Sequence, residues 1–404
     1  MMDFNNHLIP EPTPTGQLGK EKVVIIIPTY NEMFVIKNTI MQVFAAVEAI
    51  EDFDVHLLIF DSNSTDKTQD IVSSLQDDYP KLHLKREQEK SGLGSAYLQA
   101  MRYALTVMNA DIVFEFDADL SHQPKYIKPM LEKIKDFDVV VGSRYVPGGS
   151  IPKNWEWHRK VFSVLGNYVA RTVLTPKYKD FTSGFRATRR RSLINVLPQR
   201  FLSNHYAYKL QLLWLLHKSK AKICEYPIEF IDREDGESKL PKNSIIDALQ
   251  VVFTLRYYEL KRYLKMCLVG LMGMTVQFAA YNLFRKYLPA FNASQLAVLA
   301  AIIHNFILNR NFTFKSSLKL SKFFEMKRLL WFGLYSVVMI YLQSYWLKFG
   351  ITYLGSGFLQ ENLIIGVGIG LASLLNYFAY SRHVWPEPKV LNRDVPDDSK
   401  TTAT

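Results

Sequence analysis

Four uncharged stretches follow one another in the last third of the chain, and each is about 20 residues long. They cover residues 266–284, 287–308, 329–347 and 362–381. A helix of roughly 20 apolar residues is long enough to cross the hydrocarbon layer of a membrane. Such runs can also be buried core helices of a soluble protein, but four in succession are difficult to cover in one core. The sequence therefore predicts an all-α transmembrane domain of four spans over residues 266–385.

Basic residues in the connecting loops predict how these spans are oriented. The approach to the first span and the loop between the second and third spans are strongly basic, whereas the loop after the third span carries only Lys348 and Glu361. Because cytoplasmic loops carry an excess of Lys and Arg, we expect both termini and the middle loop in the cytoplasm. Arg285 and Lys286, after the first span, oppose this orientation mildly. The expected location is the plasma, inner or endoplasmic reticulum membrane.

The preceding part of the chain alternates short β-branched runs with helical stretches. Residues 23–27, 55–60, 112–116 and 139–141 are continuous apolar runs, separated by stretches such as 33–50 and 94–108. Strands buried on both faces have this pattern, which predicts an α/β domain with a mostly parallel sheet. We expect a flexible tail at 1–20, this domain at 21–240, an interfacial amphipathic helix at 241–265 and a flexible cytoplasmic tail at 386–404.

The chain is basic, with a formal net charge of +11 over 404 residues. Such a balance fits nucleic acid, acidic lipids or a phosphorylated substrate, and the predicted spans argue against nucleic acid. The two cysteines, Cys224 and Cys267, have neither metal-ligand spacing nor a disulfide framework. Residues 1–20 lack the apolar core of a signal peptide, so we expect the first domain to stay in the cytoplasm.

An acidic motif directly follows the apolar run at 112–116. It places Asp117 and Asp119 one residue apart at the end of a predicted strand. Two carboxylates in this position can share Mg²⁺ or Mn²⁺, which prefer oxygen ligands. Such a cation would neutralise a diphosphate leaving group and hold it in place. The alternative is a solvated acidic turn, because so short a motif is common.

Polar loops follow the other predicted strands as well. Residues 28–32 come after the first strand, residues 61–68 after the second, and residues 90–96 open a helix. In open sheets covered on both faces, ligands bind where the strands end, so these loops together indicate a nucleotide site. The stretch from Gly92 to Gly94 lacks the third glycine of a dinucleotide fingerprint, and no Gly-Lys-Ser/Thr loop occurs. An NAD enzyme and a P-loop ATPase are therefore disfavoured.

Arginines among aromatic residues come next along the chain. Four groups contain Arg144, Arg159, Arg186 and Arg233. The planar guanidinium forms paired, charge-assisted hydrogen bonds with phosphate, so these are candidate phosphate ligands, although each can equally be a surface charge. Residues 155–174 and 243–263 mix aromatic, apolar and basic residues in a helical pattern. Such helices fit a membrane surface or ordinary packing on the sheet.

Taken together, these motifs resemble those of the dolichol- and polyprenol-phosphate mannose synthases within glycosyltransferase family 2. The matching stretches occur in the family's order; they are residues 27–32, 61–68, 116–124, 142–145, 182–186 and 233–239. The uncharged stretches resemble the membrane module that often follows such enzymes, particularly over residues 305–314. One departure is Ser62 after Asp61, where the family usually has paired aspartates, and this departure leaves the nucleotide open.

The resemblance implies a GT-A type domain and inverting transfer without a covalent enzyme intermediate. The implied catalytic residues are Asp117, Asp119, Arg144 and Arg233. Asp117 and Asp119 would hold the metal and the donor diphosphate, with Ser121 as a further candidate metal ligand. The implied donor site also includes Pro28, Tyr30, Glu32, Asp61, Gly94 and Lys239. The acceptor phosphate would be held by Arg144, Arg159 and Ser163, while Arg233 and Lys239 would close over the reacting groups.

The resemblance also implies the reaction and its partners. We expect mannose transfer from GDP-mannose to dolichyl or polyprenyl phosphate at the cytoplasmic face of a membrane, with Mg²⁺ or Mn²⁺ and membrane lipids but without nucleic acid. Transfer of glucose or another hexose from a UDP-sugar is the alternative among enzymes. A non-catalytic flippase or scaffold for the lipid-linked sugar is the alternative of another class.

Overall fold

The computed structural model describes residues 19–152, 155, 157–232, 243–313 and 322–379. The chain divides into two compact units, of which the first ends at Arg256 and the second begins at Tyr257. This boundary lies inside one long helix, α8 (Ser244–Phe284). The predicted interfacial helix at 241–265 and the first predicted span are therefore consecutive parts of a single helix.

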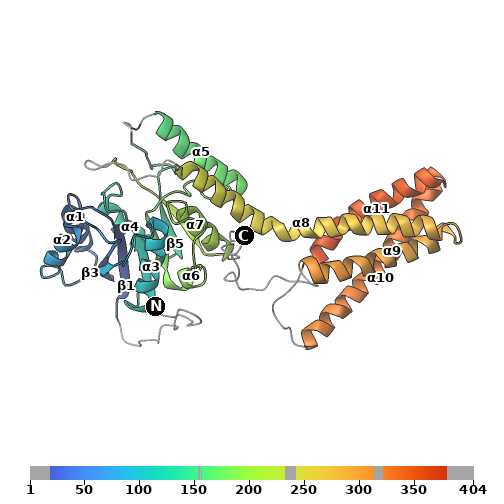
Figure 1. The fold of residues 1–404 in the computed structure, drawn as a ribbon, viewed down its shortest axis with the longest axis horizontal. Coiled ribbons are helices and arrows are strands. Elements are labelled where there is room, and N and C mark those ends of the chain that lie inside the picture. The colour runs from blue at the N-terminus through green and yellow to red at the C-terminus, as the bar shows by residue number, and fades with distance from the viewer. Residues whose placement is uncertain (1–18, 153–154, 156, 233–242, 314–321, 380–404) are drawn as a thin grey trace, which may run out of the picture. The chain divides into compact units, whose positions relative to one another are not determined.

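A sheet of seven strands forms the centre of the first unit, in the order β3–β2–β1–β4–β6–β5–β7 (Figure 1). The strands are β1 (Glu21–Thr29), β2 (Phe53–Asp61), β3 (Leu82–Arg86), β4 (Ile112–Glu115), β5 (Val139–Ser143), β6 (Arg186–Arg189) and β7 (Ile223–Pro227). Neighbouring strands are parallel except for β6, which runs antiparallel to both β4 and β5. The predicted mostly parallel sheet is confirmed.

Helices connect the strands and cover both faces of the sheet. They are α1 (Ile36–Val47), α2 (Thr68–Leu75), α3 (Leu93–Thr106), η1 (Pro124–Tyr126), α4 (Ile127–Lys133), α5 (Trp157–Val173), α6 (Arg190–Ile194) and α7 (Tyr208–Lys218). The predicted helices at 33–50 and 94–108 correspond to α1 and α3. The strands β3, β6 and β7 were not predicted, because each is short and carries polar or charged residues.

The sequence of β1 shows why this strand lies in the middle of the sheet. Residues 23–27 are fully buried, and alternate side chains point to opposite faces. Val24 and Ile26 pack in the cluster that contains residues of α3 and α7, whereas Ile25 and Ile27 pack with residues of α1 and α4. Fully burying one such side chain contributes roughly 1.5–3 kcal/mol. The continuous β-branched run is thus explained by burial on both faces.

Two helices of the first unit expose apolar side chains. On α5, Trp157, Val164 and Tyr168 are exposed, while Asn167 and Ala170 are buried against the domain. The first turns of α8 likewise expose Ile246 and Phe253. The helices predicted at 155–174 and 243–263 are therefore present, and their position at a membrane surface stays a prediction.

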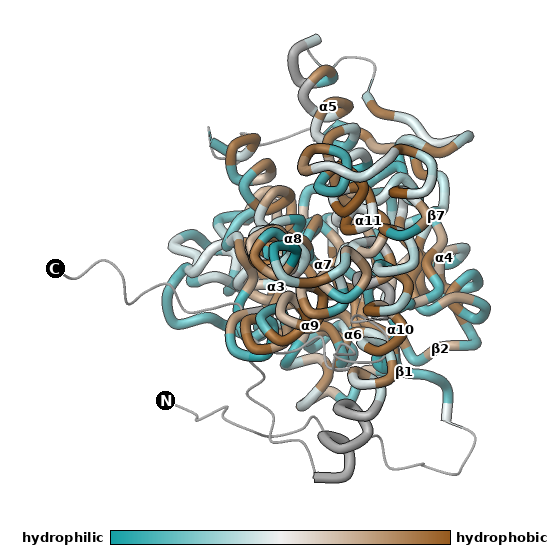
Figure 2. The backbone as a smooth tube through the Cα atoms, turned by 90° about the vertical axis from the view of Figure 1, so that its right-hand side faces the viewer, coloured by the Kyte–Doolittle hydropathy of each residue, from teal (hydrophilic) through white to brown (hydrophobic). Residues whose placement is uncertain are grey.

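The described residues of the second unit form helices joined by short turns. Besides the later part of α8, it contains α9 (Ala290–Leu308), η2 (Asn309–Thr313), α10 (Lys322–Leu354) and α11 (Phe358–Ala379). Two segments, Tyr263–Phe284 and Ala290–Phe312, are long and apolar enough to cross a membrane, and Phe358–Ser373 is a shorter apolar helix. Figure 2 shows many hydrophobic positions along α9 and α10. The expectation of four spans stays a prediction.

Candidate functional site

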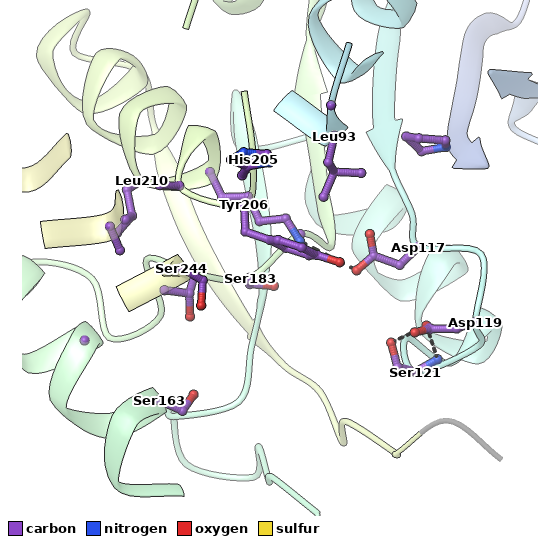
Figure 3. Close-up of a pocket in the computed structure, with 18 of the residues that line it drawn as sticks. Leu93, Asp117, Asp119, Ser121, Ser163, Ser183, His205, Tyr206, Leu210 and Ser244 are labelled. Carbon is purple, nitrogen blue, oxygen red and sulfur yellow. Dashed lines mark hydrogen bonds and ion pairs between the residues drawn. The ribbon is translucent and has the colours of Figure 1, made fainter. Parts of the chain in front are cut away.

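A cavity of about 990 Å³ lies in the first unit, at the carboxyl ends of β1, β2, β4 and β5. Loops after these strands form part of its wall, and residues of α3, α5, α7 and the first turns of α8 also line it. The acidic residues and Ser163 belong to different parts of this wall (Figure 3). The carboxyl ends of parallel strands meet at one edge of a sheet, which is the reason that separate polar loops converge here.

The acidic motif forms a compact cluster on the cavity wall. Asp117 and Asp119 follow β4, and Ser121 donates to Asp119 Oδ1 through its backbone N–H at 3.1 Å and its hydroxyl at 2.6 Å. Leu120 adopts a left-handed backbone conformation with φ of 55°, which turns the chain back on itself between Asp119 and Ser121. All three predicted metal-site residues line the cavity.

Asp117 has several partners, but they lie at long distances. The Tyr97 hydroxyl donates to Asp117 Oδ1 at 3.2 Å, whereas Lys209 Nζ and His122 Nδ1 lie 3.6 and 3.4 Å from Oδ2. Burial by itself would raise the pKa of Asp117, but the charge of Lys209 and the neighbouring donors hold it below its ordinary value. The carboxylate is therefore ionised at neutral pH.

His122 is held in an aromatic environment beside this carboxylate. Its ring stacks on Phe185 with centroids 5.0 Å apart and meets Phe116 and Phe230 edge-on. Burial lowers the pKa of His122 to about 4, although Asp117 opposes the shift. The imidazole is therefore neutral at pH 7, and its buried Nδ1 has no hydrogen-bond partner of normal length among the described residues.

The donor set of the acidic cluster fits a hard divalent cation. Two carboxylates and the Ser121 hydroxyl line one side of the cavity, and oxygen ligands are those that Mg²⁺ and Mn²⁺ prefer. Among the described residues no group of three or more His, Cys, Asp and Glu side chains is placed to hold a metal. A cation here would complete its coordination with phosphate oxygens and water, as Mg²⁺ usually does.

Arg144 lines the cavity and is held rigidly by a buried carboxylate. Its Nε and Nη2 atoms donate to the two oxygens of Asp180 at 2.7 Å each, and Nη2 also donates to the Thr182 hydroxyl at 2.6 Å. Asp180 is fully buried. Burial would lower the pKa of Arg144, but the charge of Asp180 raises it above its ordinary value. The guanidinium is therefore permanently charged and fixed in orientation.

The structure describes some of the other residues that were predicted to bind the acceptor phosphate or to close over the site. Ser163, on α5, lines the cavity, and its hydroxyl lies 2.7 Å from the hydroxyl of Tyr145. Arg159 belongs to the same helix, but its side chain lies outside the described part of the structure. Arg233 and Lys239 also lie outside the described residues. The structure thus brings Ser163 and Arg144 to the same cavity.

The predicted donor residues after β1 also line this cavity. Pro28, Tyr30 and Glu32 form part of its wall. Lys90 Nζ lies 3.4 Å from the centroid of the Tyr30 ring, a cation–π contact on the same wall. An aromatic ring beside a cation suits a base and its attached phosphates.

Comparison with known proteins assigns the family. Residues 24–197 match glycosyl transferase family 2, and residues 265–385 match the GtrA/DPMS transmembrane domain. Dolichol-phosphate mannosyltransferase of Pyrococcus furiosus is 32% identical over 371 residues, which cover 90% of this chain and 99% of that protein. The chain belongs to the polyprenol-phosphate mannosyltransferase family. Its transmembrane-domain match also identifies it as a membrane protein.

Two bacterial proteins are similar to more than half of this chain. Undecaprenyl-phosphate mannosyltransferase of Micrococcus luteus is 34% identical over 228 residues, covering 56% of this chain and 91% of its own. Polyprenol monophosphomannose synthase of Mycolicibacterium smegmatis is 33% identical over 231 residues, covering 57% and 84%. A solved mannosyltransferase of Pyrobaculum calidifontis, in complex with GDP-Man and Mn²⁺, covers 92% of this chain and 91% of its own at 15% identity, with a TM-score of 0.39. The sequence relatives therefore carry the assignment.

Asp61 was predicted to line the donor site of this mannosyltransferase, and the structure places it behind the cavity. Its buried carboxylate accepts hydrogen bonds from Thr29, Ser64 and Gln69. The neighbouring Ser62 lines the cavity instead, and Asp61 is not part of the described wall. Asp61 therefore fixes the loop after β2, and Ser62 is the residue of this pair that lines the cavity.

Gly94, another predicted donor residue, permits close packing at the start of α3. Its backbone N–H donates to the carbonyl of Asn204 at 2.8 Å, and a Cβ here would lie 2.6 Å from the Ser203 carbonyl oxygen. Gly92 has φ of 98°, which an L side chain rarely adopts. The described cavity wall contains Gly92 and Leu93 rather than Gly94.

The structure removes one basic residue from the candidate phosphate ligands and adds another basic residue to the cavity wall. Arg186, grouped from the sequence with phosphate ligands, is buried in the sheet and donates to Glu115, so it cannot reach a phosphate. Lys209, which the sequence reasoning missed, is buried on α7 and lines the cavity beside Asp117. A lysine on a helix ordinarily indicates an exposed face, so no local signal marks Lys209.

Proposed function

We propose that this chain transfers mannose from GDP-mannose to dolichyl or polyprenyl phosphate, with inversion at the sugar and with a divalent cation. The observation that carries the proposal is one cavity with an acidic cluster and a fixed guanidinium on its wall, formed by Asp117, Asp119, Ser121 and Arg144. A cation with the donor diphosphate suits the acidic cluster, and the acceptor phosphate suits Arg144 and Ser163. The names of the sequence relatives support mannose as the sugar.

In the proposed reaction, an oxygen of the acceptor phosphate forms a bond to C1 of mannose as the bond from C1 to the donor diphosphate breaks. When bound, the cation supplies positive charge that stabilises the departing diphosphate. Asp117 and Asp119 hold that charge in place. Arg144, oriented by Asp180, presents its remaining nitrogen, Nη1, to the acceptor phosphate. A strong general base is unnecessary, because the second pKa of a phosphate monoester is near 6 and the acceptor is already an anion.

Apolar side chains on the cavity wall suit the lipid part of the acceptor. Leu165, Val169 and Leu210 line the same cavity as the polar groups, as do Ile245 and Val252 of α8. They suit the first isoprene units of the acceptor. They also limit the access of water, which would otherwise hydrolyse the donor.

Transfer assays with the purified full chain test the proposal. We expect label from GDP-mannose to reach polyprenyl phosphate with Mn²⁺ or Mg²⁺, and to fall by about a hundredfold or more in EDTA or in Asp119→Ala. Asp136→Ala, an exposed aspartate outside the described cavity wall, is the matched control and should transfer normally. Preferred transfer from UDP-glucose would replace mannose by glucose, and absence of transfer from any nucleotide sugar would favour a scaffold or flippase.

We also propose four membrane spans with the catalytic unit in the cytoplasm. The basic sequence between α9 and α10 and the uncharged residues 355–357 between α10 and α11 support this orientation. With Cys224 and Cys267 replaced by serine, a cysteine introduced at Ser356, between α10 and α11, should react with an impermeant thiol reagent only from the side opposite the catalytic unit. Reaction from the catalytic side would contradict the orientation.

A further inference from the structure

The first turns of α8 are joined to the loop before α7 by a short hydrogen bond. Ser203, which is only 3% exposed, donates through its hydroxyl to Asp247 Oδ2 at 2.5 Å. Neither residue belongs to the described cavity wall. A buried hydroxyl that meets a carboxylate makes a strong, charge-assisted hydrogen bond. The contact therefore attaches α8 to this loop at a defined point.

The same hydroxyl also holds the loop that carries two cavity residues. Ser203 Oγ accepts the backbone N–H of His205 at 2.9 Å, and His205 and Tyr206 line the cavity (Figure 3). The loop packs closely on the start of α3, where the Gly94 N–H donates to the Asn204 carbonyl at 2.8 Å. Because the loop is held on that side, it gives α8 a fixed place of attachment.

The position of Asp247 on α8 determines what this hydrogen bond can fix. Val251 and Leu255 are buried and mark the face of the helix that packs on the domain. At about 3.6 residues per turn, Asp247 lies on one flank of that face, and Ile245 and Leu249, which line the cavity, lie on the other flank. Apolar contacts are non-directional and leave a helix some freedom to rotate. A hydrogen bond on the far flank therefore fixes which apolar side chains α8 presents to the cavity.

We propose that the hydrogen bond between Ser203 and Asp247 positions the α8 part of the cavity wall for the lipid chain of the acceptor. This inference rests on the proposed function, because it takes the apolar part of the wall as the acceptor site. Both are positioning residues, which act through side chains such as Ile245 and Leu249. Without the hydrogen bond, the first turns of α8 rotate or move away. The isoprene chain then loses contacts, whereas the groups that hold the donor keep theirs.

Transfer kinetics of the purified full chain in detergent, with GDP-mannose and Mn²⁺, test this proposal. In Asp247→Ala and in Ser203→Ala we expect the KM for polyprenyl phosphate to rise about tenfold, because a hydrogen bond to a charged group is lost. In Asp247→Ala the KM for GDP-mannose should stay unchanged, since Ser203 still accepts from His205. The double variant should show no further rise, because both substitutions break the same contact.

Two further variants separate positioning from folding. Asp247→Asn keeps an oxygen that can accept from Ser203, so it should restore most of the acceptor affinity. Gln250→Ala, at an exposed position on the same helix, should change neither KM. A substitution that only reduced the amount of folded enzyme would lower kcat and leave both KM values unchanged.

The outcomes separate this inference from the proposed function. An unchanged acceptor KM in both alanine variants, an equal rise of both KM values in Asp247→Ala, or a fall in kcat alone would overturn the positioning role. If the wild-type chain transfers no sugar, the proposed function fails, and equilibrium binding of radiolabelled polyprenyl phosphate tests the contact instead. Weaker binding by Asp247→Ala than by wild type would then still support the positioning role, whereas equal binding, or no binding by wild type, would overturn it.

Discussion

Two carboxylates near the end of β4, Glu115 and Asp117, lie two residues apart and have opposite surroundings. Glu115 is buried in the sheet, where Arg186 donates to its two oxygens at 2.5 and 2.9 Å and Tyr208 donates at 2.9 Å. Asp117 faces the cavity, and Tyr97, His122 and Lys209 lie 3.2 to 3.6 Å from its carboxylate oxygens. A carboxylate thus makes short hydrogen bonds in the core and longer contacts at the cavity wall.

The difference distinguishes a structural charge from one that is available to a ligand. Burial would lower the pKa of Arg186, but the charge of Glu115 and its hydrogen bonds raise it, so this pair stays ionised. The antiparallel pairing of β4 with β6 sets Glu115 opposite Arg186, which fixes the geometry of the pair. Asp117 lies beyond the paired residues of β4 and β6. Its long contacts can be replaced by contacts to a bound cation. Short, bidentate hydrogen bonds satisfy a buried charge fully, whereas long contacts leave hydrogen-bonding capacity for a ligand.

The largest expected effect comes from breaking the core pair. Arg186→Met leaves Glu115 buried and without its cation, so the free energy of unfolding should fall by about 3–5 kcal/mol. Denaturant unfolding of the full chain, followed by tryptophan fluorescence, measures this change. A double variant, Glu115→Leu with Arg186→Met, should recover much of the loss, because no unpaired charge remains. Equal stability of the single and double variants would contradict the structural role of the pair.

The matched variant at the cavity is Asp117→Asn. It keeps the size of the side chain and removes the charge, so we expect transfer to fall by about a hundredfold or more while the unfolding midpoint changes little. Lys209 loses its anion in this variant, but the side chain of Asp117 itself is 23% exposed to the cavity, so its carboxylate is not a charge sealed in the core. A loss of stability comparable with that of Arg186→Met would show that Asp117 is a second structural charge.

Sequence patterns predicted the central strands of the domain better than they predicted which charged residues line the cavity. The strands β1, β2, β4 and β5 have continuous apolar runs, and burial on both faces requires such runs. The acidic motif could be placed at the edge of the sheet because it follows one of these strands. The short strand β6 could not be predicted, since it consists of residues 186–189 with an arginine at each end.

Long-range packing explains why the roles of three site residues were hidden. Arg186 acquires its role from a strand partner 71 residues away. Lys209 reaches Asp117 only because Gly184 leaves space for it. Asp61 accepts hydrogen bonds from Thr29, 32 residues away, and from Gln69 of α2. Each of these is a contact between side chains that sequence spacing does not specify.

A third carboxylate, Asp54, extends the comparison to the surface of the domain and has the smallest expected effect. Its own burial raises its pKa, but hydrogen bonds from Lys81 and His56 lower it to about 2. A carboxyl whose pKa is lower in the folded state stabilises the fold above its unfolded pKa of about 4, and this contribution is lost as the pH falls toward 2. Because Asp54 and Lys81 are partly exposed, we expect Asp54→Asn to cost less than about 1 kcal/mol at pH 7. Denaturant unfolding at pH 7 and pH 2.5 should show the difference between wild type and variant shrinking at the lower pH, and a difference that grows on acidification would contradict the assignment.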